Sequence, residues 1–319
     1  MTSYNECCEK FLNYVDIERR LSKCTYNTYR KALKAFGDYL SQNNINQIEQ
    51  IKSSSIQYFI MKLKHDNKEV NSINVHISTI KSLYKYLILE NVVNLDPTIS
   101  IQTLRRHKKL PGFFKTDEMD FLLDQPSLER DTKHEYRDQF VSLRDKAIIE
   151  LLYATGIRVS ELVGMDLDRY YPEERAIKVI GKGNKERIVP IGEIAVQAIS
   201  EYIEFRNQIA KAGEKALFVN DQGTRTTTRN VSYRLKIYAE THDFKNRIHP
   251  HKLRHTFATV MLQNSHNIRA VQELLGHAQL TSTQIYTHTD ILSLSKEYDR
   301  THPRDRIEQK IKSRNKDLE

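Results

Sequence analysis

Apolar side chains recur in the first hundred residues with the spacing of α-helices. In residues 25–40 the intervals between them are three and four, so they share one face of a helix. These positions are Tyr26, Tyr29, Leu33, Phe36 and Leu40. The same spacing over 73–88, with shorter patterns over 6–18 and 53–64, predicts an all-helical domain that ends near Pro97.

Beyond residue 115 the pattern mixes two periods. Helical spacing covers the segments 143–156, 158–165, 193–206, 253–263 and 268–276. Two short runs rich in β-branched residues, 176–180 and 187–191, flank a glycine-containing loop and predict an antiparallel hairpin. The charged, weakly periodic residues 125–142 predict a surface loop or a short insertion. We therefore expect a mainly α protein, with an all-α N-terminal domain and a mostly helical α+β C-terminal domain that carries a small antiparallel sheet.

Length and composition agree with two globular domains. A chain of 319 residues is long for one hydrophobic core, and no apolar run approaches the roughly 18 residues that span a bilayer. The acidic N-terminus lacks the apolar core of a signal peptide, so we expect a cytoplasmic protein. Cys7, Cys8 and Cys24 show no metal-type CxxC spacing, and reduced packing or surface cysteines are expected.

Positive charge is concentrated in one short stretch. The chain carries 50 Lys and Arg against 41 Asp and Glu, a net charge of +9. Residues 105–115, RRHKKLPGFFK, contain five of the basic residues and no acid, whereas the segments on either side nearly balance. This pattern indicates a linker that holds a polyanion, with a solvated linker as the alternative. The expected segments are a helical N-terminal domain 1–104, the basic linker 105–115, a second domain 116–304 and a charged tail 305–319.

Several motifs have an ordinary interpretation when each is taken alone. The two glycines of GKGNKER join strand to strand, whereas a phosphate loop must lead into a helix, and Lys182 at the hairpin tip can simply be solvated. The histidines of HPHKLRH, residues 249–255, lack the glutamate of a zinc-binding HExxH helix, so no metal is expected. Arg158 and His277 each follow a helix end, where they can cap carbonyl groups.

Six residues nevertheless stand in an order that has chemical meaning. They are Arg158, Lys182, His251, Arg254, His277 and Tyr286. They lie in the stretches ELLYATGIRVSELVGMDL, VIGKGNKERIVPIG, HPHKLRHTFAT and VQELLGHAQLTSTQIYTH, which YDRTHPR follows. With these stretches the chain resembles the tyrosine recombinases, most closely the Xer type of bacterial chromosome and plasmid recombinase. The resemblance extends from about residue 148 to 304, and the helical first domain with its basic linker fits the same layout. It implies that 1–104 is a DNA-binding domain and that 116–304 is the catalytic domain.

The resemblance implies a reaction at a DNA phosphodiester. Tyr286 would attack the phosphorus and leave a 3′-phosphotyrosine and a free 5′-hydroxyl. A tyrosine with an ordinary pKa near 10 is a poor nucleophile, so the surrounding cations are essential to this role. Arg158 and Arg254 would clamp the non-bridging oxygens, because guanidinium forks suit that geometry better than lysine.

The remaining three residues would handle protons and charge. His251 would accept or orient the tyrosine proton, His277 would donate to a phosphate oxygen, and Lys182 would protonate the leaving 5′-oxygen. No metal is implied, because protein cations surround the phosphate. No ATP or other cofactor is implied, because the phosphotyrosine conserves the energy of the broken bond.

The implied partner is double-stranded DNA with inverted-repeat half-sites. Four protomers would assemble on this DNA, either all copies of this chain or copies of this chain together with a sister recombinase. A DNA translocase is a further candidate partner, and no membrane is expected. The candidate DNA contacts are Arg105, Arg106, Lys108 and Lys109 in the linker, and Lys81 and Lys85 on the polar face of helix 73–88. Residues 290–319 begin with a small apolar face that needs a partner surface. The resemblance implies that this surface belongs to a neighbouring protomer, with packing on its own domain as the alternative.

Resolution of chromosome or plasmid dimers is the expected task, with a mobile-element integrase or transposon recombinase as the alternative. A type IB topoisomerase would share the chemistry, but the Xer-like N-terminal domain and HPR tail argue against it. The six intact residues argue against a DNA-binding protein that has lost cleavage. A metal-dependent nuclease would need clustered carboxylates near the histidines, and the sequence has none there.

Overall fold

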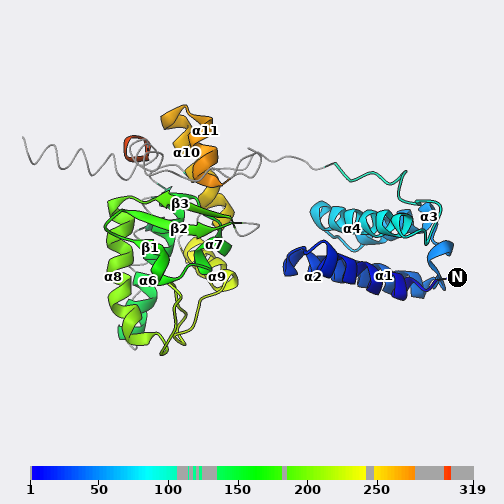
Figure 1. The fold of residues 1–319 in the computed structure, drawn as a ribbon, viewed down its shortest axis with the longest axis horizontal. Coiled ribbons are helices and arrows are strands. Elements are labelled where there is room, and N and C mark those ends of the chain that lie inside the picture. Colours follow the sequence, from blue (N-terminus) through cyan, green and yellow to red (C-terminus); the bar gives the residue numbers. More distant parts are fainter. Residues whose placement is uncertain are drawn as a thin grey trace, which may run out of the picture. The chain divides into compact units, whose positions relative to one another are not determined.

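The structure, a computed structural model, describes residues 2–105, 114, 118–119, 122–123, 135–181, 185–241, 248–276 and 298–302. The chain divides into two compact units, residues 1–109 and 110–319, drawn in blue to cyan and in green to red in Figure 1. Each unit has its own cluster of buried apolar side chains. The division falls within the stretch 105–115, most of which lies outside the described residues, so the predicted segment boundaries stay predictions.

The N-terminal unit is built from helices that share one core. They are α1 (Tyr4–Asn13), which continues as a π-helical turn (Tyr14–Glu18), α2 (Lys23–Gln42), the 3-10 turn Ile48–Gln50, α3 (Ser53–His65) and α4 (Val70–Leu89). The hydroxyl of Ser22 caps α2 by accepting from the backbone N–H of Thr25 at 3.3 Å. On the predicted stripe, Leu33, Phe36 and Leu40 are buried, and α4 packs against α1, α2 and α3.

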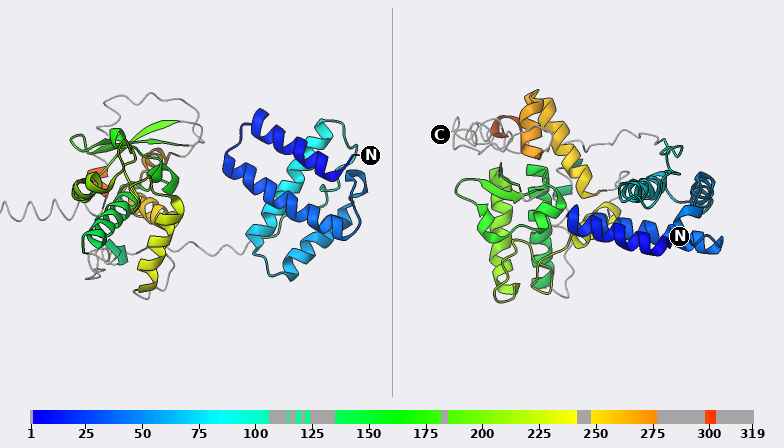
Figure 2. Two further views of the ribbon diagram at one scale, coloured as in Figure 1. Left: turned by 90° about the horizontal axis from the view of Figure 1, so that it is seen from below. Right: turned by 45° about the vertical axis from the view of Figure 1, so that its right-hand side comes forward.

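The second unit combines helices with a small sheet, as Figure 2 shows from two further directions. Its elements are α6 (Glu135–Thr155), α7 (Val159–Val163), the 3-10 turn Leu167–Arg169, β1 (Tyr170–Tyr171), β2 (Ala176–Ile180), β3 (Glu186–Pro190), α8 (Glu193–Ile209), α9 (Thr228–Thr241), α10 (Pro250–Ser265) and α11 (Ile268–Leu275). The strands are antiparallel in the order β1-β2-β3, and Val179 of β2 lies opposite Arg187 of β3. The expected mainly α fold with a small antiparallel sheet is confirmed.

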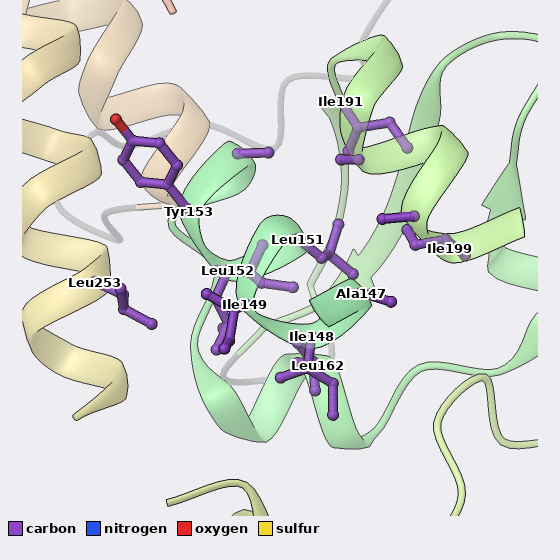
Figure 3. Packing of buried hydrophobic residues seen from close by; sticks show 14 of the residues in the cluster. Ala147, Ile148, Ile149, Leu151, Leu152, Tyr153, Leu162, Ile191, Ile199 and Leu253 are labelled. Carbon is purple, nitrogen blue, oxygen red and sulfur yellow. The ribbon is translucent and has the colours of Figure 1, made fainter. Parts of the chain in front are cut away.

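Helix α6 forms the centre of this unit. It packs along α8 and against α10, and its side chains are all buried from Ala147 to Ala154, including the polar Glu150. Figure 3 shows Leu151 and Leu152 of α6 among Leu162 from α7, Ile199 from α8 and Leu253 from α10. Because α6 is enclosed on several sides, the turn at its C-terminal end is held on a rigid support.

Three parts of this unit differ from the sequence-based expectation. Residues 135–142 were expected in a loop, but they form the first two turns of α6, because Phe140 is fully buried and extends the apolar face of that helix. Residues 125–134 of the expected loop lie outside the described residues. Helix α9 and strand β1 were not predicted. Helix α9 buries Val231, Leu235 and Tyr238, a helical spacing that polar neighbours obscure in the sequence.

A short C-terminal segment, residues 298–302, packs on the second unit. Both carboxylate oxygens of Asp299 accept from Nη2 of Arg175, at 2.8 and 2.7 Å. Nδ2 of Asn264 donates to the carbonyl of Thr301 at 2.7 Å. The buried ring of His302 stacks on Tyr298 at 5.0 Å. For these residues the structure shows packing within the same chain; residues 290–297 and 303–319 lie outside the described residues.

The cysteines and the helices agree with an ordinary globular chain. Cys7 and Cys8 are buried, Cys24 is exposed, and all three are free thiols, as expected. Among the residues that the structure describes, none of the helices has the length and apolar character needed to cross a bilayer.

Candidate active site

Arg158 lies in the turn between α6 and α7. Gly156 ends α6 with a φ of 59°, a left-handed conformation that glycine adopts without strain, and a side chain here would meet the ring of Phe257. Arg158 then caps α7. Its backbone N–H donates to Oε2 of Glu161 at 2.8 Å, and its Nη1 donates to Oε1 at 2.9 Å. One carboxylate thus orients both the main chain and the guanidinium of Arg158, whose side chain stays 39% exposed.

A second arginine, Arg187, binds the carboxylate of Glu161. Nη1 and Nη2 of Arg187, on β3, donate to the two oxygens of Glu161 at 3.0 and 2.9 Å, and both side chains are buried. Burial alone would raise the pKa of Glu161, but the hydrogen bonds from Arg187 and Arg158 outweigh it, and the pKa is lowered. Glu161 is therefore ionised at neutral pH. Neither Glu161 nor Arg187 was singled out from the sequence.

Arg254 projects from α10 to the same region. Its Nη1 donates to the carbonyl of Gly156 at 2.6 Å, and its Nη2 donates to the carbonyl of Leu275 at 2.7 Å. Burial, with the nearby charge of Arg158, lowers the pKa of Arg254 to about 10. The guanidinium is still charged at neutral pH. Since Gly156 precedes Arg158 by two residues, one turn of backbone positions both arginines.

His251 and the neighbouring histidines lie at the start of α10. His251 is exposed and one turn before Arg254, so the two side chains share a face of the helix. Nδ1 of His249 caps the helix by accepting from the N–H of Lys252 at 3.1 Å, and burial lowers the pKa of His249. No cluster of three or more potential metal-binding side chains occurs in the described part of the chain.

Lys182, His277 and Tyr286 lie outside the described residues, but two of them adjoin described glycines. The N–H of Gly181 donates to the carbonyl of Lys185 at 2.8 Å and closes the base of the hairpin loop. A Cβ atom on Gly181 would lie 3.6 Å from Nη1 of Arg187. Gly276, the residue before His277, has a φ of 64°, and a Cβ atom there would lie 2.9 Å from Cζ of Arg187. Arg187 is thus adjacent to Gly181 and to Gly276, the residues that precede Lys182 and His277.

The predicted DNA contacts are described only in part. On α4, Lys81 is half-buried and Lys85 is exposed, and Arg105 is exposed. Arg106, Lys108 and Lys109 lie outside the described residues. A DNA-contacting role for these six residues stays a prediction.

The end of the basic linker is fixed to α10. Phe114 is buried, and its N–H donates to Oγ1 of Thr256 at 3.0 Å. Nζ of Lys252 lies 3.7 Å from the centre of the Phe114 ring. Burial lowers the pKa of this lysine, against the opposing effect of Glu118. Residue 114 is therefore attached to the helix that carries His251 and Arg254.

Family profiles and related proteins match most of this chain. The profile of the Phage integrase family matches residues 123–291, and that of the Phage integrase N-terminal SAM-like domain matches residues 8–91. Tyrosine recombinase XerC of Actinobacillus succinogenes is 36% identical over 93% of this chain and 97% of its own length. Tyrosine recombinase XerC of Vibrio cholerae is 37% identical over 95% of this chain and 94% of its own length.

Solved structures share the fold at lower identity. The XerH recombinase bound to a palindromic difH substrate superposes with a TM-score of 0.67 at 20% identity, over 97% of this chain and 83% of that one. A lambda integrase tetramer bound to a Holliday junction superposes with a TM-score of 0.63 at 15% identity, over 90% of this chain and 81% of that one.

The chain therefore belongs to the phage integrase family, whose tyrosine recombinases cut and rejoin DNA strands. Within that family it is a Xer-like site-specific tyrosine recombinase, as the sequence motifs predicted.

Proposed function

We propose that Tyr286 is the nucleophile of this recombinase and that Arg158 and Arg254 hold the scissile phosphate. The observation that carries the proposal is the placement of the two arginines. Arg158 lies in the turn before α7 and Arg254 on α10, the backbone turn at Gly156 positions both, and both guanidinium groups are only partly buried. Such a pair suits a phosphate with two non-bridging oxygens.

The proposed reaction is a transesterification. The Tyr286 hydroxyl oxygen forms a bond to phosphorus, and the bond between phosphorus and the 5′-oxygen breaks. The tyrosine proton passes to His251, and Lys182 supplies the proton that the 5′-oxygen acquires. The arginines and His277 stabilise the charge that builds on the phosphate oxygens. The product is a 3′-phosphotyrosine, from which the reverse attack by a 5′-hydroxyl rejoins DNA.

We further propose double-stranded DNA with inverted half-sites as the substrate, bound by four protomers. Support comes from structural neighbours that are described as bound to difH and, as a tetramer, to a Holliday junction. The similarity to XerC proteins favours resolution of chromosome or plasmid dimers, in the cytoplasm, over a mobile-element role. Pairing with a sister recombinase and control by a DNA translocase rest on the Xer resemblance alone.

Replacing Tyr286 by Phe tests the central assignment. The change removes only the hydroxyl, so covalent attachment to DNA should be lost while DNA affinity stays nearly unchanged. The assay incubates each variant with a nicked suicide substrate and separates covalent complexes on a denaturing gel. Tyr233, an exposed tyrosine on α9, provides the control, and Tyr233→Phe should cleave normally. A covalent band that persists with Tyr286→Phe would contradict the proposal.

A further inference from the structure

We propose that Arg187 is a positioning residue for the cleavage reaction, acting through the supports of both phosphate-binding arginines. This inference rests on the proposed roles of Arg158 and Arg254. Arg187 lies on β3, five residues after Lys182, and its side chain is only 7% exposed. Its effect on catalysis must therefore pass through the groups that it contacts.

The first path runs through Glu161. Arg187 donates to both oxygens of that carboxylate at 3.0 and 2.9 Å, and the same two oxygens accept from the N–H and Nη1 of Arg158. A carboxylate held on one edge by a planar fork has a fixed orientation. Without that fork, Glu161 could rotate with Arg158, because the contacts of Arg158 to it are all within one short turn.

The second path runs through the end of α11. Nε of Arg187 donates to the carbonyl of Leu274 at 3.3 Å, and the next carbonyl, of Leu275, accepts from Arg254 at 2.7 Å. Gly276 packs its backbone against the guanidinium so closely that a Cβ atom would lie 2.9 to 3.0 Å from three of its atoms. Arg187 thus fixes the last turn of α11, from which Arg254 takes one of its two backbone partners.

The chemistry of arginine explains why this position needs it. One guanidinium supplies two parallel donors to Glu161 and a third to Leu274, whereas an ammonium group cannot reach the carboxylate in a fork and the carbonyl together. A buried ion pair adds little net stability compared with apolar side chains of similar size. The main consequence of this pair is therefore the relative position of Arg158 and Arg254.

The test compares Arg187→Lys with a structural control. Lysine keeps the charge and lets the protein fold, but it loses the fork. Arg206→Lys is the matched control, because Arg206 is an equally buried arginine of the same unit that donates to the carbonyls of Glu214 and Ala216. Cleavage of a suicide substrate is measured well below the melting temperature of each variant, so that the folded fraction is the same.

We expect Arg187→Lys to slow cleavage by about 10- to 100-fold, as a displacement of catalytic groups by a fraction of an ångström to one ångström does. Arg206→Lys should lower the melting temperature by a similar amount and leave cleavage within about threefold of the wild type. Cleavage by Arg187→Lys that matches Arg206→Lys would overturn the inference.

A second substrate separates the arginines from the general acid. When sulfur replaces the 5′-bridging oxygen, the leaving group needs no proton, so Lys182→Ala should recover. Arg187→Lys should not recover, because the phosphate still needs its clamp. Recovery of Arg187→Lys would show that it acts through the lysine hairpin and would overturn the inference. Normal cleavage by Arg158→Ala and Arg254→Ala would instead refute the proposed function, whatever Arg187→Lys does.

Discussion

The guanidinium of Arg254 is held by two backbone carbonyls and not by a carboxylate. Carbonyl groups orient an arginine without cancelling its charge. Arg158 and Arg187 share the single carboxylate of Glu161, so the three arginines and one glutamate carry a net charge of +2. An excess of positive charge on partly buried groups attracts a phosphate and stabilises the additional charge of the transition state.

We predict the effect of removing each of the two arginines that are proposed to bind the phosphate. Arg158→Ala and Arg254→Ala should each slow cleavage by roughly two to three orders of magnitude, as the loss of one oxyanion donor does. Lysine should rescue poorly, because it cannot form a bidentate contact. Single-turnover cleavage of the suicide substrate measures both, with the exposed Arg229→Ala as control. Near-normal cleavage by Arg254→Lys would argue against the phosphate clamp.

The sequence identifies some of these residues and not others. Arg158 and Arg254 could be predicted because their order along the chain, with a tyrosine after them, matches a known pattern. Glu161 and Arg187 are 26 positions apart, on a helix and a strand. Each has the ordinary sequence context of a polar residue at the edge of an apolar run. Their pairing depends on how α7 packs on β2, which residue spacing does not reveal.

The elements show where hydrophobic spacing is sufficient. Helices α2, α4, α8 and α11 follow their predicted ranges closely, because each has one long apolar face and polar flanks. Strand β1 has only two residues, which is too short for any period to be recognised. The start of α6 was missed because its first turns are highly charged, and burial of Phe140 by tertiary packing outweighs that composition.

We expect the positive charge of the linker 105–115 to contribute to DNA affinity. Phe114, near the C-terminal end of the basic stretch, is bound to α10. The stretch is therefore attached to the catalytic unit at a defined position. Replacing Arg105, Arg106, Lys108 and Lys109 together by Ala should weaken binding to all DNA sequences alike. Each lost phosphate contact should lower the slope of log K against log salt by about 0.9.

Salt-dependent binding isotherms on specific and unrelated duplexes measure that slope. Lys236→Ala serves as the control, because Lys236 is an exposed lysine of α9 paired with Glu240. A changed sequence preference at an unchanged salt slope would mean that the linker reads bases and does not contact phosphates.

At the scale of the whole molecule, the C-terminal segment stabilises the catalytic unit. Tyr298, Thr301 and His302 are buried, and Arg175 and Asn264 bind the segment by hydrogen bonds. Truncation after Thr289 should therefore lower the melting temperature by roughly 5–10 °C, since it exposes at least one large buried side chain and leaves polar groups unpaired. Scanning calorimetry of the full and truncated chains measures the shift.

Gel-shift assays on one and two half-sites follow the other expected property of this region, docking on a neighbouring protomer. A chain ending at His302 is the informative control, because it keeps the described segment and removes residues 303–319. Loss of cooperative binding with this chain, at an unchanged melting temperature, would assign the intersubunit contact to the removed residues. An unchanged melting temperature after truncation at Thr289 would contradict the stabilising role.

The described end of α11 sets a limit on how far the proposed nucleophile, Tyr286, can reach. Gly276 at the end of α11 and the buried Tyr298 are described positions of the same unit, and Tyr286 lies between them in the sequence. Tyr286 is ten residues beyond Gly276 (286 − 276). At no more than about 3.6 Å per residue, its Cα atom stays within roughly 36 Å of that glycine in any conformation. One turn of B-DNA is about 34–36 Å long. The proposed nucleophile, Tyr286, is therefore restricted to phosphates within about one turn of B-DNA from the end of α11.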